Sequence, residues 1–268
     1  MRHLLRIAGL SIILAVYYAV GVENSVIKPT WVQVVFNPVG SDLEMNTYIL
    51  AKLLLYFAPL AIFQILHGNV MYRSFCTVGI YLFTRQASRA RWFLKQSLQV
   101  LVTAFIFRVA MQATLFFILL RTNNLTSLEG GVQAMFYDAV IFTCLASITS
   151  ILMNLLSIAL SNGNGALIVF GAQAVCLGAL TFWNGRVGIE TSSSTQRAFS
   201  LLWINPIAHA VLPWQSSRNP ALDAGIRQLG HSHDLMITVV LVIAVLLVLT
   251  AIGVGIVRRQ DILDIPQR

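Results

Sequence analysis

The stretch 81–96 carries the residues of this chain that are best placed for ionic chemistry. It reads YLFTRQASRARWFLKQ and contains four basic side chains and no acidic one, namely Arg85, Arg89, Arg91 and Lys95. Two interpretations account for this cluster. Basic side chains in a short loop hold that loop on the cytoplasmic side of a membrane. The same side chains could also bind a cytoplasmic protein.

The residues around the cluster bear on the second interpretation. The apolar run CTVGIYLF, residues 76–83, precedes it, and a solvated loop does not normally expose such a run. The hydroxyl of Ser88 is suited to cap a following helix, which would carry Arg91 and Lys95 on one face. Trp92 suits a membrane–water interface. We therefore expect an apolar plug followed by a rigid basic ridge.

A second candidate is Arg108, which falls near the middle of an apolar run. A charge there costs about 2.5–3.5 kcal/mol on insertion scales. Gln112 lies one turn away on the same face, whereas Asp138 differs in depth by about eight residues, or roughly 12 Å, which exceeds easy reach. We therefore expect Arg108 either to bond neutral groups or to face a water-filled or anionic-substrate path. The neutral groups at similar depth are Ser147, Thr149, Ser150 and Gln173.

The signatures of common catalytic and metal sites do not occur in the sequence. It contains no GxxxxGKS or GxxxxGKT, HExxH or GxSxG motif and no paired acids in an apolar run. His231 and His233 lie two residues apart without companions, and Cys76, Cys144 and Cys176 show no CxxC spacing. We expect this chain to be no enzyme and to hold no metal or cofactor itself.

The composition places most of the chain in lipid. Hydrophobic residues make up 57% of the 268 residues and charged residues 10%, where ordinary soluble chains carry roughly 25% charged residues. The mean hydropathy is +0.77. At about 20 residues a span, this length accommodates about six spans with short loops. The net charge of +8 fits basic cytoplasmic loops, and we expect no nucleic-acid partner.

We predict an all-α polytopic membrane protein that forms one transmembrane domain over residues 1–268. The apolar runs predict six transmembrane helices at about 4–22, 47–66, 97–120, 134–159, 166–184 and 235–257. A cytoplasmic loop at 67–95 would follow the second helix, and a long outer segment at 185–234 would follow the fifth. The first run has an alternative as a signal peptide, because Arg2 and Arg6 precede it.

The distribution of basic residues predicts the orientation. In the short loops and tails, ten basic residues fall on one side and two, Lys28 and Arg121, on the other. The positive-inside rule then makes both termini cytoplasmic. The ten are Arg2, Arg6, Arg73, Arg85, Arg89, Arg91, Lys95, Arg258, Arg259 and Arg268.

The outer segment contains a distinctive stretch at 197–215. It alternates apolar and polar residues, is broken by proline, and carries interfacial aromatics; the residues concerned are Trp203, Asn205, Pro206, Pro213 and Trp214. Backbone that dips into a membrane without regular structure must be buried in protein or line a cavity. The stretch is therefore either a pair of short re-entrant helices or an ordinary interfacial loop.

Four features together resemble the membrane subunit of type-2 ATP-binding-cassette transporters, most of which are exporters. They are TRQASRARWFLKQ between spans two and three, the six-span layout with both ends inside, RAFSLLWINPIAHAVLP before span six, and RRQDIL after it. In this order they cover most of the chain and are similar to the pattern of small bacterial members. The chain departs from that pattern at His67-Gly68-Asn69, where the family often has an acidic patch.

The resemblance implies a coupling element within 67–95 that docks on a cytoplasmic ATPase dimer, and that dimer would bind ATP and Mg²⁺. The expected coupling residues are Arg85, Ser88, Arg89, Arg91, Trp92 and Lys95. It also implies a second membrane subunit, identical or related, outer re-entrant helices above the path, and the bacterial plasma membrane as the location. The residues expected along the path are Arg108, Gln112, Ser147 and Gln173.

The expected function is therefore ATP-driven export, and the apolar walls suit an amphipathic drug, a peptide or a lipid-like cargo. Two alternatives stay open. One is a transporter or channel that works without ATP. The other is a membrane scaffold or immunity protein that binds a toxic peptide without moving it.

Overall fold

A computed structural model describes most of the chain in separate stretches. These are residues 2–23, 29–36, 47–84, 88–122, 125–160, 163–187, 204–212, 215–223 and 233–259. Some residues singled out in the sequence lie outside them, namely Arg85, Trp203, Pro213, Trp214 and His231.

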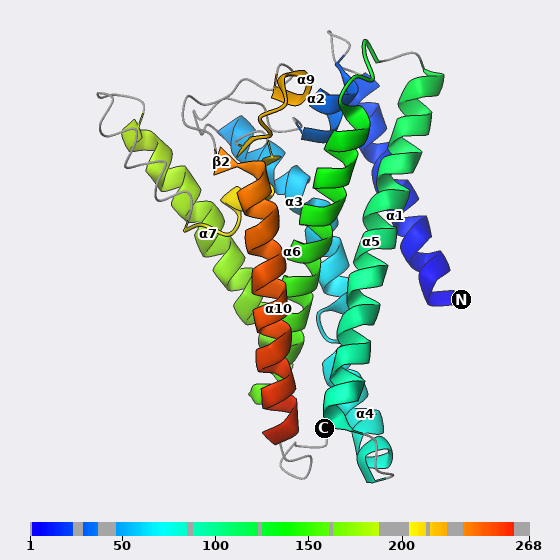
Figure 1. Ribbon diagram of the computed structural model, residues 1–268, viewed down its shortest axis with the longest axis vertical. Coiled ribbons are helices and arrows are strands. Elements are labelled where there is room, and N and C mark those ends of the chain that lie inside the picture. The colour runs from blue at the N-terminus through cyan, green and yellow to red at the C-terminus, as the bar shows by residue number, and fades with distance from the viewer. Residues whose placement is uncertain are drawn as a thin grey trace.

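The described residues are almost entirely helical (Figure 1). The main helices are α1 (Arg2–Glu23), α2 (Trp31–Phe36), α3 (Thr47–His67), α4 (Val70–Thr84), α5 (Arg89–Arg121), α6 (Gly131–Ala159), α7 (Gly165–Val187) and α10 (Leu235–Arg259). Short elements lie between α7 and α10, namely η1 (Ala208–Ala210), β1 (Gln215–Ser216), α9 (Pro220–Asp223) and β2 (His233–Asp234). The two strands pair in parallel over two residues each. The prediction of an all-α fold is confirmed.

Four helical stretches are long and apolar enough to cross a membrane. They are Leu53–Thr77, which runs from α3 into α4, Arg89–Arg121, Gly131–Ala159 and Leu235–Arg259. The apolar stretches found in α1 and α7 are shorter, at Gly9–Val20 and Gly165–Ala179. The structure therefore supports a multi-pass membrane protein with four long apolar helices, where the sequence predicted six spans.

Helix α6 lies at the centre of the bundle and α10 on its outside. Of the most apolar window of α6, 61% is buried within the protein, against 17% for α10. Figure 1 shows α6 with α5 on one side and α7 on the other, and α10 packs on both α5 and α6. The exposed apolar side chains of α10 are suited to lipid, because a soluble protein rarely leaves so large an apolar area in water.

Aromatic side chains fill the core between the helices. The ring of Phe107 on α5 lies 5.8 Å from that of Phe63 on α3 and 6.0 Å from that of Phe142 on α6, measured between centroids. At the first residue of α6, Gly131, Trp31 of α2 packs directly over the backbone, where a Cβ atom would collide with the indole. Such close approaches let short helices and long ones share one core.

The stretch 67–95, predicted as a loop that joins two spans, is largely helical. Residues 70–84 form α4, which the sequence analysis did not predict, and the helix expected after Ser88 runs without a break into the span expected from about residue 97. Met71 and Phe75 are four residues apart, so both face the core of the bundle, and both are fully buried. The helix continues because these apolar residues gain burial and because no proline interrupts them.

A single side chain from α6 bridges the break between α3 and α4 at Gly68–Asn69. Asn154, which is fully buried, donates from Nδ2 to the carbonyl of His67 at 2.9 Å. Its Oδ1 accepts a bond from the backbone N–H of Tyr72 at 3.0 Å. A carbonyl at the end of one helix and an N–H at the start of the next both lack helical partners, and lipid offers none. Asn154 supplies both.

Gly68 allows this approach. A Cβ atom on Gly68 would lie 2.6 Å from the sulfur of Met153 and 2.7 Å from the carbonyl oxygen of Gln64. Because glycine carries no Cβ, α6 can come close enough for Asn154 to reach both sides of the break.

We expect Asn154→Leu to destabilise the protein by about 2–4 kcal/mol, because a buried donor and a buried acceptor each lose a partner worth about 1–3 kcal/mol. The free energy of unfolding in mild detergent measures this. The matched control is Thr250→Val, which removes a 2.7 Å bond from Thr250 to the Leu246 carbonyl within α10. Equal losses in the two variants would contradict the proposed role of Asn154.

Candidate functional site

The most strongly built polar site joins α5 and α6 through a buried ion pair. Arg108 donates from Nε to Oδ2 of Asp138 at 2.6 Å and from a terminal nitrogen to Oδ1 at 2.8 Å. The two side chains are only 10% and 3% exposed. This two-point geometry is the strongest arrangement of a guanidinium on a carboxylate. It neutralises both charges away from water.

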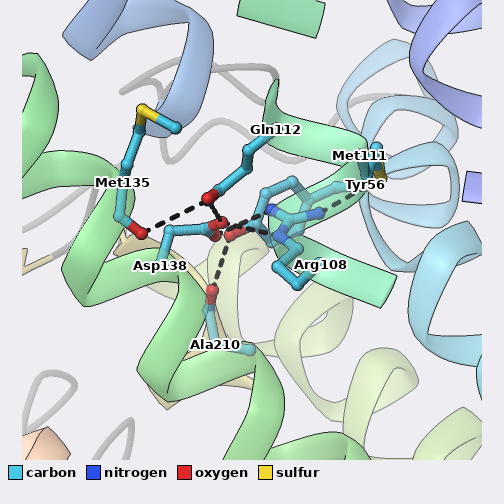
Figure 2. A network of polar contacts seen from close by, with 7 residues as sticks. All are labelled: Tyr56, Arg108, Met111, Gln112, Met135, Asp138 and Ala210. Atoms are coloured by element: carbon cyan, nitrogen blue, oxygen red, sulfur yellow. Dashed lines mark hydrogen bonds and ion pairs between the residues drawn. The ribbon is translucent and has the colours of Figure 1, made fainter. Parts of the chain in front are cut away.

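Neighbouring groups complete the coordination of the pair (Figure 2). Gln112 donates from Nε2 to Oδ2 of Asp138 and also, at 3.4 Å, to the carbonyl of Met135. The remaining face of the guanidinium lies 4.8 Å from the ring centroid of Phe142, a cation–π contact. Asp138 thus accepts three bonds from α5, which fixes the relative position of α5 and α6.

The prediction that Asp138 lies beyond the reach of Arg108 is wrong. Arg108 stands thirteen residues before the end of α5, and Asp138 stands seven residues after the start of α6. Measured from these two neighbouring helix ends, the heights of their Cα atoms along the bundle differ by six residues, or about 9 Å. Gln112 stands nine residues from the end of α5 and is therefore nearly level with Asp138. The long side chain of Arg108 spans this difference in height, because its extended stem can run along the helix.

The bonds of Arg108 go to Asp138 and Met111, and not to the predicted neutral partners. Thr149 accepts a 2.8 Å bond from Nε2 of Gln64, which ties α6 to α3. Ser147 and Ser150 are fully buried on α6, and no bond joins either hydroxyl to Arg108. Gln173 is half-buried on α7. Of the four residues predicted along the path, the structure brings together only Arg108 and Gln112.

Two small hollows flank the ion pair, with cavity volumes of about 20 Å³ and 30 Å³. Both are lined by Tyr56, Arg108 and Asp138, which therefore form the wall between them. Aromatic and aliphatic side chains make up most of the remaining lining of each hollow. Hollows of this size with polar groups in their walls have room for a water molecule rather than for a larger ligand.

The segment 204–212 is inserted among three helices. Asn205 donates to the carbonyl of Cys176 on α7 at 2.8 Å, and Tyr56 of α3 donates to the carbonyl of Ala210 at 2.8 Å. His209 lies 3.2 Å from the hydroxyl of Thr238 on α10 through Nδ1. The six residues from Ile207 to Leu212 are all buried. This backbone, which lies outside any α-helix, is therefore enclosed by protein, as a membrane requires.

Only part of the predicted re-entrant element can be followed. Asn205 begins a turn in which its Oδ1 accepts a 3.0 Å bond from the N–H of Ile207, and Pro206 is exposed within that turn. The regular structure here is η1, one turn of three residues. The expected second break, at Pro213 and Trp214, lies outside the described residues.

The predicted helix cap at Ser88 is confirmed. Its hydroxyl accepts a bond from the N–H of Arg91 at 3.5 Å, and α5 begins at the next residue, Arg89. Trp92 is half-buried and lies 5.8 Å from Phe75 of α4 between ring centroids, which joins α4 to the first turn of α5. Trp92 is thus a packing residue of this hairpin.

Among the described residues, no three histidine, cysteine, aspartate or glutamate side chains gather as metal ligands do. Sequence reasoning missed Tyr56 and Asn154 and left Asp138 unpaired. One signal was available for Asp138, since it is the only acid within any predicted span and an intramembrane acid normally has a partner. Nothing in the sequence distinguished Tyr56 from an ordinary interfacial tyrosine.

Comparisons of the chain with protein-family models, with curated proteins and with solved structures give no match. The functional argument therefore rests on the residues and their geometry.

We expect Arg108→Gln or Asp138→Asn to lower the free energy of unfolding by about 3–5 kcal/mol, because each leaves an unpaired buried charge. The double variant Arg108→Met/Asp138→Leu should lose less than either single one, since it removes both charges and keeps apolar volume. Unfolding in detergent of the unaltered protein, the two single variants and the double variant Arg108→Gln/Asp138→Asn gives the coupling. Losses that simply add would contradict a direct ion pair.

We expect Tyr56→Phe to loosen the segment 207–212, because the carbonyl of Ala210 loses a hydrogen bond worth about 1 kcal/mol. Amide hydrogen exchange over these residues should quicken about fivefold. Tyr17→Phe, on an exposed tyrosine of α1, is the control. Unchanged exchange in Tyr56→Phe would show that this bond does not hold the segment.

Proposed function

We propose that the chain is the six-span membrane subunit of an ATP-driven exporter and that both its termini are cytoplasmic. The observation that carries the proposal is the α4–α5 hairpin, which lies at one end of the bundle together with the end of α10 (Figure 1). Six of the ten basic residues predicted to be cytoplasmic belong to these elements, namely Arg73, Arg89, Arg91, Lys95, Arg258 and Arg259. The start of α1, with Arg2 and Arg6, lies about halfway along the bundle (Figure 1). The hairpin would be the part that meets the ATPase.

The hairpin is built to pass a displacement into the membrane. Phe75 and Trp92 hold α4 against the start of α5, so the two move together. Asn154 fastens the α3–α4 break to α6, and Gln64 adds a second bond between α3 and α6 through Thr149. A push on α4 would therefore reach α6, the most buried helix, through hydrogen bonds and packed rings.

Six spans are compatible with the helix lengths. Helix α1 has 22 residues and α7 has 23, which at about 1.5 Å a residue exceed the roughly 30 Å of a bilayer core. The fifth and sixth spans would then be joined by the segment 204–212, which closes the outer end between them. A path formed by one such chain is incomplete, so a second membrane subunit is part of the proposal.

The chain itself would supply contacts and no covalent chemistry. ATP and Mg²⁺ would belong to the partner ATPase. The proposed cargo is an amphipathic drug, peptide or lipid-like molecule, which the apolar composition of the chain suits. The hollows beside the ion pair are too small for it, so the cargo would pass between this chain and the second subunit. Transport would require that the cargo and the ATPase bind the two states of the bundle with different affinity.

The test is purification of the tagged chain from its own membranes in mild detergent. We expect an ATPase with a phosphate-binding loop to accompany it in stoichiometric amount. Arg85→Glu/Arg89→Glu should release the ATPase, because reversed charge at the hairpin opposes docking. Arg121→Glu, at the other end of α5, should keep it.

Two results would contradict the proposal. A chain that purifies without any ATPase would favour a transporter or channel that works without ATP. Protection against a toxic peptide that persists when ATP hydrolysis is abolished would favour an immunity or scaffold protein.

A further inference from the structure

The exposed face of α5 changes from basic to apolar along its length. Arg91 and Lys95 are both exposed and stand one turn apart at the start of the helix. The same face continues, at spacings of three and four residues, with exposed apolar side chains: Leu98 at 60%, Val102 at 48%, Phe105 at 48% and Val109 at 36%. Residues so spaced on a helix form one continuous stripe.

This stripe points away from the bundle. The residues of α5 that are buried against other helices include Phe93, Val100, Ala104, Phe107 and Met111, which lie on other faces of the helix. A stripe of large exposed apolar side chains on a membrane-spanning helix contacts acyl chains. Arg91 and Lys95 therefore stand at the end of a lipid-facing surface.

The depth of Arg91 agrees with a headgroup level, and Lys95, about 6 Å further into the bundle, can reach that level through its long stem. Phe93 of α5 packs directly on Gly253 of α10, which sets the relative height of the two helices. Arg91 lies two residues from Phe93 toward the end of the bundle and Arg258 lies five from Gly253, or about 3 Å and 7.5 Å. Arg91 is thus within one turn of the level at which α10 changes from apolar residues to Arg258.

Within the part of the chain that the structure describes, neither Arg91 nor Lys95 forms an ion pair. The first turn of α5 has no acidic residue. Among the described residues, the acidic side chains that form ion pairs are Asp138, with Arg108, and Asp234, with Arg218. Both pairs involve the opposite half of the bundle, because α6 and α10 begin there.

We propose that Arg91 and Lys95 bind the phosphate of an anionic phospholipid whose acyl chains lie along Leu98, Val102 and Phe105. Two cations one turn apart match a phosphodiester, and lysine and arginine stems extend readily to the headgroup level. A zwitterionic lipid fits less well, because no described acid on this face receives its ammonium group. The proposal does not depend on the exporter proposal.

The experiment uses the full chain in nanodiscs of phosphatidylcholine that contain a trace of spin-labelled phosphatidylglycerol or spin-labelled phosphatidylcholine. The fraction of motionally restricted label gives the preference for the anionic lipid. We expect Arg91→Gln/Lys95→Gln to reduce this preference by about fivefold for each side chain. Arg121→Gln, exposed at the far end of the same helix, should leave it unchanged.

A second control separates a site from general surface charge. Arg258→Gln/Arg259→Gln removes two exposed charges from the same end of the bundle, and its effect should be clearly smaller. Equal losses in the two double variants would overturn the site. An unchanged lipid preference in Arg91→Gln/Lys95→Gln would also overturn the site. If the same variant lost a co-purified ATPase, these residues would be a protein contact instead. Because the nanodiscs contain no ATPase, the lipid measurement neither supports nor contradicts the exporter proposal, which the co-purification experiment tests.

Discussion

The ion pair between Arg108 and Asp138 is the interaction on which the arrangement of the bundle depends. Either charge alone, at 10% or 3% exposure, would be strongly unfavourable between apolar helices. Together they form a neutral unit that is satisfied only in one relative position of α5 and α6. Gln112 narrows that position further by adding a bond to the same carboxylate. Helix α6 can then serve as the fixed centre for the other helices.

The same constraint acts on the backbone wherever a helix is interrupted. Lipid offers no hydrogen bonds, so an unpaired N–H or carbonyl must find a partner in the protein. At the α3–α4 break that partner is Asn154. At the segment 204–212, the carbonyl of Ala210 accepts a bond from the hydroxyl of Tyr56, and Asn205 donates to the carbonyl of Cys176. Polar side chains on the buried faces therefore mark the places where the backbone departs from a continuous helix.

Much of the fold could be predicted from apolar runs, and the sites only in part. The cap at Ser88 and the bounds of α1, α3, α6, α7 and α10, to within a few residues, follow from local composition, which needs no knowledge of neighbours. The pairing of Arg108 with Asp138 does not, because it depends on the relative heights of two helix ends and on the reach of a long side chain. The helical state of residues 70–84 was missed for a related reason. It is favoured by burial of Met71 and Phe75 against other helices, and local sequence does not show that burial.

The central claim is that Arg108 and Asp138 form a charged pair inside the bundle, and infrared spectroscopy tests it most directly. The difference spectrum between the unaltered protein and Asp138→Asn in lipid isolates the vibration of this one carboxyl group. The account predicts the antisymmetric stretch of an ionised carboxylate, shifted by its bonds to a guanidinium. A carbonyl stretch of a protonated acid would contradict the account, because a neutral Asp138 would leave Arg108 without its counter-charge.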